Sequence, residues 1–365
     1  MIEIKLLNKA QLENFILSKE YSNLENLPIS KHRAFSHIEN PRAEKDDVLL
    51  LLAYFEEEMV GYLGVLPDNI FLENKMQKCA WLSCLWVNPK QRGKQIGFKL
   101  VQKAIDVWNR KIIITEFTDS AKRLYDKTDN FEKLETKEGI RLYIQSDLQK
   151  ILPPKKEIFR KTIPLLKFID FAINTFIKIP LFFNKQDIDN FSLENITEID
   201  KELTEFIEEN QEKEIFKRQE KEINWIIKNP WILSAPKVDE FNKRYYFSSI
   251  EKSFEFIPLK VKDKDNKLIA FILFTKRNDF LKMPYCYYKK GAEVDIVKII
   301  NHHIINLKIK TFTCYNINIS EYLLKNKTLS IYKKQTVRKY LISKSFNFKE
   351  TNFNIQDGDG DCAFT

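Results

Sequence analysis

The feature that most constrains the fold is an order of short apolar runs and helically spaced segments that occurs twice. In residues 2–145, apolar runs of strand length alternate with segments that have apolar residues at helical spacing. Residues 196–345 have the same order: a helical region, a hairpin, a third strand, a helix, a strand, a helix and a last strand. Strands that alternate with helices after an antiparallel meander predict a mixed sheet covered by helices. We therefore predict an α/β fold with an internal duplication.

The chain of 365 residues exceeds the usual length of one domain, roughly 150 residues. Between the two repeats the amino-acid composition changes. Residues 151–190 contain several prolines, and lysines alternate there with aromatic and aliphatic residues. We predict one domain at 1–150, a basic amphipathic linker at 151–190 and a second domain at 191–365.

The linker predicts one or two amphipathic helices within residues 155–185. Its charges interrupt the apolar run too often for a membrane span, which needs about 20 mainly apolar residues. Such a helix can pack between two domains, or it can lie in a membrane interface. The sequence favours packing, and contact with a membrane surface through 155–185 stays open as the alternative.

Composition narrows the class of protein. The net charge of +9 comes from 60 Lys and Arg against 51 acidic residues that are spread along the chain, so nucleic acid is not the expected partner. Five cysteines without paired spacing argue against a disulfide framework or a zinc site and indicate a reducing compartment. The first residues form no apolar signal segment, which favours the cytoplasm.

The C-terminal stretch QDGDGDCAFT has the composition of a cation-binding loop. A calcium loop needs about six or more oxygen ligands, and it needs a bidentate acid in addition to the aspartates of this stretch. We therefore predict no metal site, and we expect a flexible acidic end or a loop beside the acceptor.

The stretch NPKQRGKQIGFKLVQKAI, residues 88–105, places basic residues and two glycines directly before a helix. Unpaired amides at a helix start and the helix dipole attract phosphates. Gly93 permits a tight turn, and Gly97 would let a ligand approach the first helical turn. Arg92 and Lys94 add positive charge. This spacing is compatible with a phosphate site and equally with a solvated turn.

The segment LWVNPKQRGKQIGFKLVQKAI, followed by DSAKRLYDKTDNF, resembles the GCN5-related N-acetyltransferase (GNAT) family. That family has a strand, V-x-P, a Q/R-x-x-G-x-G/A loop with a helix, and later an N-x-x-A-x-x-L-Y-x-K-x-G-F segment. The resemblance implies the acyl-CoA N-acyltransferase fold, with acetyl-CoA as the acyl donor.

The resemblance also implies which residues hold the donor. The loop amides would bind its pyrophosphate, and these belong to Arg92, Gly93, Lys94, Gln95, Ile96 and Gly97. The backbone of the preceding strand would hold the pantetheine arm and the thioester carbonyl, and these residues are Leu85, Trp86 and Val87. In the family this strand bulges, and the bulge would free a backbone N–H for the carbonyl.

For catalysis, Tyr125 stands at the tyrosine of the family's LY pair, which would protonate the departing CoA thiolate. Glu116 and Asp68 are the candidates for the general base, and an acceptor amine that arrives neutral would need neither. Cys84 is interpreted as a small core residue rather than a nucleophile, because no histidine follows at a recognisable spacing.

The leading prediction is an N-acyltransferase that moves an acetyl or other acyl group from acyl-CoA to a primary amine by direct attack. Gln95 stands where the family usually has glycine, and Thr118 replaces an asparagine. These departures motivate a non-catalytic CoA-binding or scaffold protein as an alternative. The tandem order and the basic linker motivate a tRNA-dependent aminoacyltransferase at a membrane surface as another.

The second repeat has only a short loop before its helix at 292–307 and lacks the Q/R-x-x-G-x-G/A pattern. We therefore expect the second domain to be a degenerate GNAT-like domain that binds no CoA and shapes the acceptor site.

Overall fold

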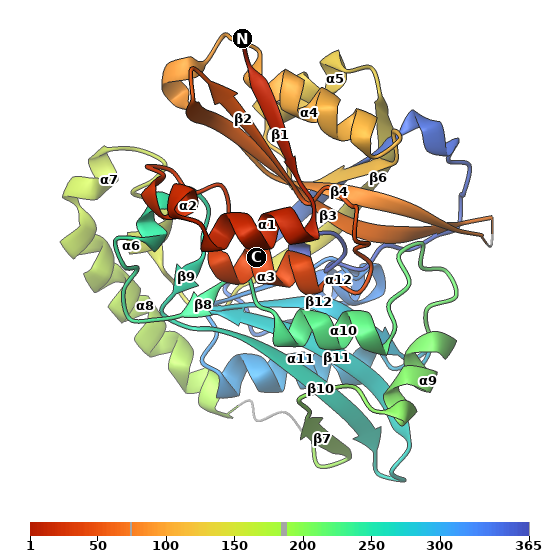
Figure 1. Cartoon of the computed structure of the whole chain (residues 1–365). Coiled ribbons are helices and arrows are strands. Elements are labelled where there is room, and N and C mark those ends of the chain that lie inside the picture. Colours follow the sequence, from red (N-terminus) through yellow and green to blue (C-terminus); the bar gives the residue numbers. More distant parts are fainter. Residues whose placement is uncertain (74, 184–187, 365) are drawn as a thin grey trace. The chain divides into compact units, whose positions relative to one another are not determined.

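A computed structural model describes residues 1–73, 75–183 and 188–364 (Figure 1). The helices of these residues are α1 Lys9–Leu17, α2 Lys19–Asn23, α3 Lys31–Glu39, α4 Ile96–Val107, α5 Asp119–Lys127, α6 Leu148–Ile151, α7 Ile158–Lys161, α8 Ile163–Phe183, α9 Lys201–Glu209, α10 Glu220–Lys228, α11 Glu293–Asn306 and α12 Ile317–Lys325. The strands are β1 Glu3–Leu7, β2 Leu50–Phe55, β3 Glu58–Leu72, β4 Lys75–Val87, β5 Ile112–Thr115, β6 Phe131–Tyr143, β7 Phe191–Asn195, β8 Leu233–Ser234, β9 Ile250–Glu251, β10 Phe254–Asp263, β11 Leu268–Arg277, β12 Phe280–Tyr288, β13 Thr311–Cys314 and β14 Tyr332–Ser343.

The chain forms two compact units, and neither is one continuous stretch. Unit 1 comprises Met1–Lys137, Thr197–Phe256 and Arg338–Thr365, and unit 2 comprises Glu138–Ile196 and Ile257–Val337. The predicted ranges 1–150 and 191–365 were drawn along the sequence, whereas these units are assembled from segments far apart in it.

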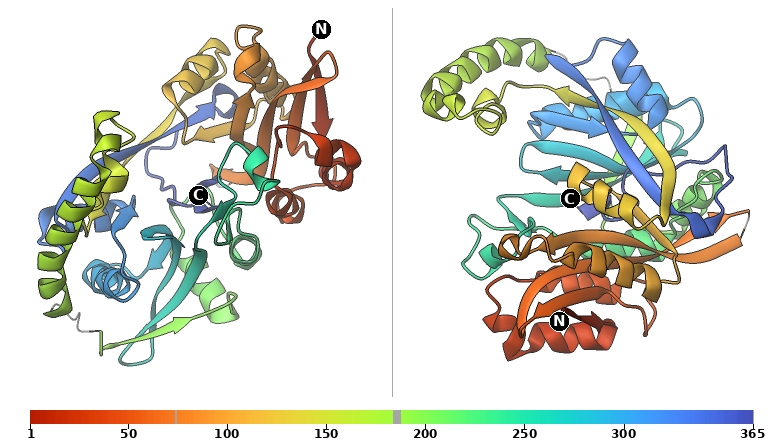
Figure 2. Two further views of the ribbon diagram at one scale, coloured as in Figure 1. Left: turned by 90° about the vertical axis from the view of Figure 1, so that its left-hand side faces the viewer. Right: turned by 90° about the horizontal axis from the view of Figure 1, so that it is seen from above.

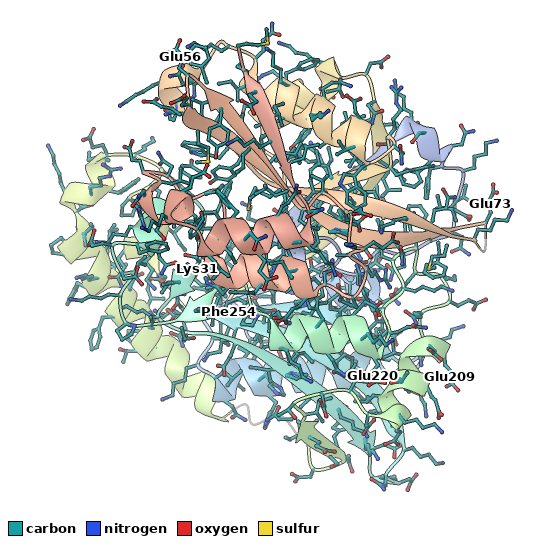
Figure 3. All side chains as sticks on the ribbon, viewed as in Figure 1. Lys31, Glu56, Glu73, Glu209, Glu220 and Phe254 are labelled. Atoms are coloured by element: carbon teal, nitrogen blue, oxygen red, sulfur yellow. The ribbon has the colours of Figure 1, made fainter. Side chains whose placement is uncertain are left out.

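The sheet of unit 1 begins as an antiparallel meander and becomes mixed at β5. β1, β2, β3 and β4 pair antiparallel in that order, β4 pairs parallel with β5, and β5 pairs antiparallel with β14. Glu56 and Glu57 form the turn between β2 and β3 and occupy left-handed conformations there. Figure 3 shows Glu56 at this turn and Glu73 at the turn between β3 and β4.

Both faces of the unit 1 sheet are covered, which explains why β2 is apolar throughout. Leu51 and Ala53 belong to a core cluster shared with α4 and α5. Leu50 and Leu52 belong to the opposite cluster, which includes residues of α1 and α3. Successive side chains of a strand point to opposite faces, so a strand with two covered faces has no polar alternation.

Unit 2 repeats the strand directions of unit 1. β11 pairs antiparallel with β12, β12 pairs parallel with β13, and β13 pairs antiparallel with β6. On the other side, β10 pairs antiparallel with β7. Its core cluster is formed mainly by aliphatic residues of these strands and of α11 and α12. The mixed α/β sheet predicted for each repeat is therefore confirmed.

The last strand of each repeat pairs in a way that the sequence order does not reveal. β6 follows α5 in the chain, but its residues Ile140–Tyr143 pair with β13 of unit 2. β14 follows α12, and its residues Tyr340–Ile342 pair with β5 of unit 1. Each unit is thus completed by the strand that follows the last helix of the other repeat.

The C-terminal stretch is a correction to the expectation of a flexible acidic end. Within the described residues of this stretch, Asp357 and Asp359 are buried, with exposed fractions of 4% and 0%. Both carboxylates have arginine partners, because Asp357 pairs with Arg338 and Asp359 with Arg218. The aspartates are therefore internal ion-pair partners rather than solvated charges.

Candidate functional site

The site of unit 1 begins with a bulge in β4. Tyr62 is opposite Trp86 while Gly64 is opposite Ser83, so β4 contains one residue more than β3 across this span. Cys84 within the bulge has a φ of +55°. Gly64 is required opposite it, because a Cβ there would lie 2.9 Å from the carbonyl oxygen of Ser83. A bulge leaves a backbone N–H without a ladder partner, as the sequence interpretation anticipated.

The loop after β4 turns twice before α4 begins. Residues Pro89–Gln91 form a 3-10 turn whose N-cap is Asn88, with the Asn88 Oδ1 atom 3.0 Å from the Lys90 amide. Gly93 then has a φ of +91° and open space around it, and Gln95 has a φ of +57° as the N-cap of α4. Gln95 therefore adopts the left-handed conformation that glycine adopts freely, at a cost of about 1 kcal/mol.

A cavity of about 1130 Å³ lies over this loop, beside β4, α4 and α5. Eight of the nine predicted donor-binding residues line it, namely Leu85, Trp86, Val87, Arg92, Gly93, Gln95, Ile96 and Gly97. The ninth, Lys94, is not among the lining residues, and its ammonium lies 3.8 Å from the centroid of the Phe55 ring.

Two further cations, which the sequence analysis did not identify, line the cavity. Arg123 and Lys127 lie four residues apart on α5, so they share a face of that helix. This spacing in DSAKRLYDK was the signal that could have identified them. Tyr246 and Phe247 also line the cavity, from a segment more than a hundred residues away in the sequence, and no local pattern predicts them.

Gly97 has a different reason from the predicted one. A Cβ at Gly97 would lie 2.9 Å from Leu124 Cδ1 and 3.6 Å from Val87 Cγ2. The missing side chain thus allows α5 to pack closely on α4, which is a packing requirement rather than an approach path for a ligand.

Tyr125 lies in an aromatic cluster beside the cavity and is not among the residues that line it. Its ring packs edge-on against Phe117 and Phe131, with centroid separations of 6.1 and 5.9 Å. Burial, with an additional contribution from the Asp361 carboxylate, raises the pKa of Tyr125 above its usual value. The phenol is therefore fully protonated at neutral pH, the state in which a general acid must begin.

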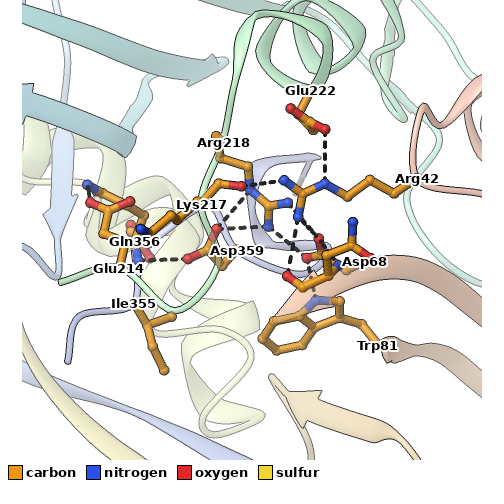
Figure 4. Close-up of polar contacts among 12 residues, drawn as sticks. Arg42, Asp68, Trp81, Glu214, Lys217, Arg218, Glu222, Ile355, Gln356 and Asp359 are labelled. Carbon is orange, nitrogen blue, oxygen red and sulfur yellow. Dashed lines mark hydrogen bonds and ion pairs between the residues drawn. The ribbon is translucent and has the colours of Figure 1, made fainter. Parts of the chain in front are cut away.

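The two carboxylates predicted as bases lie in different surroundings. Glu116 is half-exposed and pairs with Arg338, with 2.6 Å between the Arg338 Nε and Glu116 Oε1 atoms. Asp68 is buried between Arg42 and Arg218 and also accepts a hydrogen bond from the Trp81 indole at 2.9 Å (Figure 4). Burial alone would raise the pKa of Asp68, but the two guanidinium groups outweigh it and hold the pKa well below its usual range.

Asp68 belongs to a larger buried network that links β3 to the C-terminal stretch. Arg218 donates to both Asp68 oxygens at 2.8 Å and to Asp359 at 2.9 and 3.1 Å (Figure 4). Arg42 adds an ion pair of 3.0 Å to Glu222. Neither Asp68 nor its partners are among the residues that line the cavity. This arrangement gives the Asp68 carboxylate a structural role that the sequence did not indicate.

A second buried cation supports the bulge itself. The Arg33 guanidinium donates to Cys84 Sγ and Ser83 Oγ, each at 2.6 Å, and to the Tyr245 hydroxyl at 3.1 Å. The Ser83 hydroxyl in turn contacts the Asp361 carboxylate. Cys84 is thus a half-buried residue with an arginine on its sulfur, which corrects the expectation of a plain core position.

Among the residues that the structure describes, no group of three or more His, Cys, Asp or Glu side chains could hold a metal ion. No helix in the same residues is long and apolar enough to span a bilayer.

Residues 14–131 match the model of the acetyltransferase (GNAT) family. No curated protein sequence matches the chain. Among solved structures, a GCN5-related N-acetyltransferase from Anabaena variabilis is 13% identical, with a TM-score of 0.51, and the match covers 93% of this chain and 72% of that one. A probable N-acyltransferase from Enterococcus faecalis is 8% identical, with a TM-score of 0.53 and coverages of 94% and 72%.

The N-myristoyltransferase of Saccharomyces cerevisiae, solved with bound myristoyl-CoA, is also similar. It is 12% identical, with a TM-score of 0.52, and the match covers 96% of this chain and 84% of that one. At such identities the likeness concerns the fold, and it extends over both units. The prediction of an acyl-CoA N-acyltransferase fold is therefore confirmed.

Proposed function

We propose that this chain moves an acyl group from acyl-CoA to a primary amine, because residues 14–131 match the model of the acetyltransferase (GNAT) family. The observation that carries this proposal is the cavity over the bulged β4 strand and the loop that opens α4. It combines a bulged strand, a helix start and three lining cations.

In the proposed complex, the loop amides from Arg92 to Gly97 hold the pyrophosphate of the donor at the start of α4. The first turn of α4 contains no acidic residue, so its dipole is not neutralised there. Arg92 comes from the loop before α4, whereas Arg123 and Lys127 come from α5, so two separate segments contribute positive charge to the cavity. The pantetheine arm then runs along Leu85, Trp86 and Val87.

We propose direct transfer without a covalent enzyme intermediate. The neutral amine attacks the thioester carbon, the carbon–nitrogen bond forms, and the carbon–sulfur bond breaks after a tetrahedral oxyanion. A backbone N–H that the bulge leaves free stabilises this oxyanion. Tyr125 gives its proton to the departing CoA thiolate, whose conjugate thiol has an ordinary pKa of about 8.5.

For the amine proton we propose Asp361, with Glu116 as the second candidate. Asp361 contacts Ser83, the residue that precedes Cys84 in the bulge, and its charge acts on Tyr125. Burial raises the pKa of Asp361, although Arg33 opposes this, and a higher pKa makes a carboxylate a better base. Glu116 is paired with Arg338. Of the two predicted bases, Asp68 is engaged by two arginines.

The donor site is tested by calorimetric titration of the full chain with acetyl-CoA, and in parallel with myristoyl-CoA. The variant Arg92→Glu/Arg123→Glu should bind at least about tenfold more weakly, because each reversed charge replaces attraction to a phosphate by repulsion. The matched control is Lys289→Glu/Lys290→Glu, which reverses two exposed lysines before α11. Equal affinities for all three proteins would refute the proposed donor site.

The proton acceptor is tested separately by steady-state turnover with a panel of primary amines. Asp361→Asn should lower kcat more than Glu116→Gln does, while acetyl-CoA affinity stays the same. The reverse order would assign the role to Glu116, and equal kcat values for both variants and wild type would indicate that the amine arrives neutral.

A further inference from the structure

Helix α8 buries Leu166 and Asp170 against the protein and exposes several large apolar residues to solvent. Asp170 is buried and accepts hydrogen bonds from the amides of Leu148 and Gln149 at 2.8 and 3.0 Å. Asn174 exchanges two hydrogen bonds with the Ser146 backbone, at 2.7 and 2.8 Å. These contacts hold α8 against α6 within unit 2 (Figure 2).

The opposite face of α8 is apolar and exposed. Phe168, Phe171 and Phe176 have exposed fractions of 69%, 71% and 76%, and Leu165 is 57% exposed. The steps between these four residues are three, three and five, which at about 100° per residue keep the side chains on one side of the helix. Three exposed phenylalanines on one helix face form a contiguous apolar patch, which is rare on the surface of a protein that has no partner there.

Positive charge borders this patch. Lys155, Lys156, Arg160, Lys161 and Lys167 are all exposed, and the single acidic residue between 155 and 167 is Glu157. Within the described part of the chain, none of these five cations forms an ion pair with another residue. The segment therefore combines an exposed apolar face with unneutralised cations at its start.

We propose that this face of α8 lies flat in the interface of a lipid bilayer with anionic headgroups, with the cations of 155–167 on the headgroups. The phenylalanines would enter the boundary between headgroups and acyl chains, where apolar side chains lose their contact with water. The lysines and the arginine would meet the negative surface potential of anionic lipids. This is the membrane-surface alternative that the sequence analysis left open for residues 155–185.

Charge decides between a lipid surface and a second copy of the chain. Two copies that meet through this face would bring two sets of five cations together, with one glutamate in each segment to offset them. Like charges in a shared interface oppose association. An anionic bilayer supplies the complementary charge over the whole patch. The inference does not depend on the proposed acyl transfer.

The test is co-sedimentation of the full chain with vesicles of phosphatidylcholine alone and of an equal mixture of phosphatidylcholine and phosphatidylserine. Wild type should sediment with the mixed vesicles and at least tenfold less with phosphatidylcholine alone. The variant Phe168→Ser/Phe171→Ser/Phe176→Ser should lose at least tenfold in partition to the mixed vesicles. Lys155→Glu/Lys156→Glu/Lys161→Glu should lose as much, and added salt should weaken wild type.

The matched control is Val294→Ser/Ile317→Ser/Ile331→Ser, which removes three exposed apolar side chains of unit 2 outside α8 and should sediment like wild type. Circular dichroism and the thermal midpoint establish that the α8 variants are folded. Wild type that stays in the supernatant with both vesicle types would overturn the proposal. So would a serine variant that sediments like wild type, or a dimer in sedimentation velocity that the serine variant dissociates.

Discussion

The two strand-to-helix connections that open α4 and α11 share two features and differ in two. Gly93 and Gly291 both have a φ of +91° and open space around them. The strand before each helix is irregular, because β4 has one residue more than β3 at Cys84 and β12 has one residue more than β11 between Lys282 and Tyr285. The connection before α4 runs over eight residues and includes a 3-10 turn, whereas the connection before α11 consists of residues 289–292. Gln95 also holds a second left-handed position before α4.

Charge separates the two helix starts further. The first turn of α4 has no acidic residue, while the first turn of α11 contains Glu293 and Asp295. Acidic side chains stabilise a helix start by opposing its dipole, and for the same reason they repel a phosphate. The comparison teaches that the helix start in unit 2 is stabilised by its own acidic residues. The helix start in unit 1 has no such residues, so its positive dipole end can attract an anion.

The units also differ in the charge that they bury. Five buried ionisable residues of unit 1 pair with one another, namely Asp68, Arg218, Arg338, Asp357 and Asp359. Unit 2 is built around a mainly aliphatic cluster, and its buried ionisable residues include Asp147, Asp170 and Lys260. Burying charges costs free energy unless they are paired, so buried ion pairs are weak evidence for stability.

The largest expected difference between the repeats concerns their tyrosines. Tyr125→Phe should lower kcat about a hundredfold, because a general acid typically contributes at least that factor. Acetyl-CoA affinity should stay the same, since only the hydroxyl is removed. Tyr322→Phe on α12 is the matched control and should leave kcat unchanged. Steady-state kinetics measure kcat for both variants. Equal kcat values would show that Tyr125 is not the general acid.

The buried charges of unit 1 predict a pH-dependent stability. Burial, with the charge of Asp359, raises the pKa of Glu214 to about 8 from its ordinary 4.5. The native state therefore keeps a proton that the unfolded chain releases, and this stabilisation is lost as the pH rises through about 8. The loss is up to about 1.4 kcal/mol for each pH unit between about 4.5 and about 8, or roughly 5 kcal/mol in all.

Glu214→Gln should remove this dependence, because the amide resembles the protonated acid. Urea unfolding near pH 5 and near pH 8 measures it, and the two pH values bracket the shift. The variant should be more stable than wild type at the higher pH. Parallel pH profiles for the two proteins would show that Glu214 does not titrate in this range.

A smaller change should make the start of α4 resemble that of α11. Phe98 is the third residue of α4, as Asp295 is of α11. Phe98→Asp should weaken acetyl-CoA binding about tenfold by placing a carboxylate beside the pyrophosphate. Phe98→Asn has nearly the same shape without the charge and should lose less. Calorimetry separates the two, and identical losses would mean that the aromatic ring matters rather than the charge.

The smallest effect concerns the left-handed Gln95. Gln95→Gly should raise the free energy of unfolding by less than about 1 kcal/mol, because the relief of strain is partly offset by the flexibility of glycine in the unfolded chain. Gly291→Ala is the reciprocal change and should lower it by about 1 kcal/mol. A destabilised Gln95→Gly protein would show that the glutamine side chain makes a compensating contact.

Much of the local structure could be predicted from the sequence. The helix predicted at 292–307 is α11, Glu293–Asn306, and the acidic residues Glu56 and Glu57 form the turn between β2 and β3. Asn8 caps α1, and its side chain accepts a hydrogen bond from the Gln11 amide. These features follow from side-chain period, capping and turn chemistry, which act over a few residues.

The pairing of β6 and β14 could not be predicted in this way. Both are strands that follow the last helix of a repeat, and local pattern does not state which sheet edge a strand joins. Arg123 and Lys127 were within reach of a helical-spacing argument, whereas Tyr246 and Phe247 were not, because they come from a distant segment.

The sequence by itself determined the order of elements, the match of residues 14–131 to the GNAT family model and the composition of the loop from Arg92 to Gly97. Only the tertiary structure decided which charges meet. Asp68, Arg218 and Asp359 are residue types that usually lie on the surface, and they can be buried because the fold brings Arg218 within 3.1 Å of both carboxylates. Burial of a charge costs free energy unless the charge is paired, and the partner here comes from a segment far along the chain.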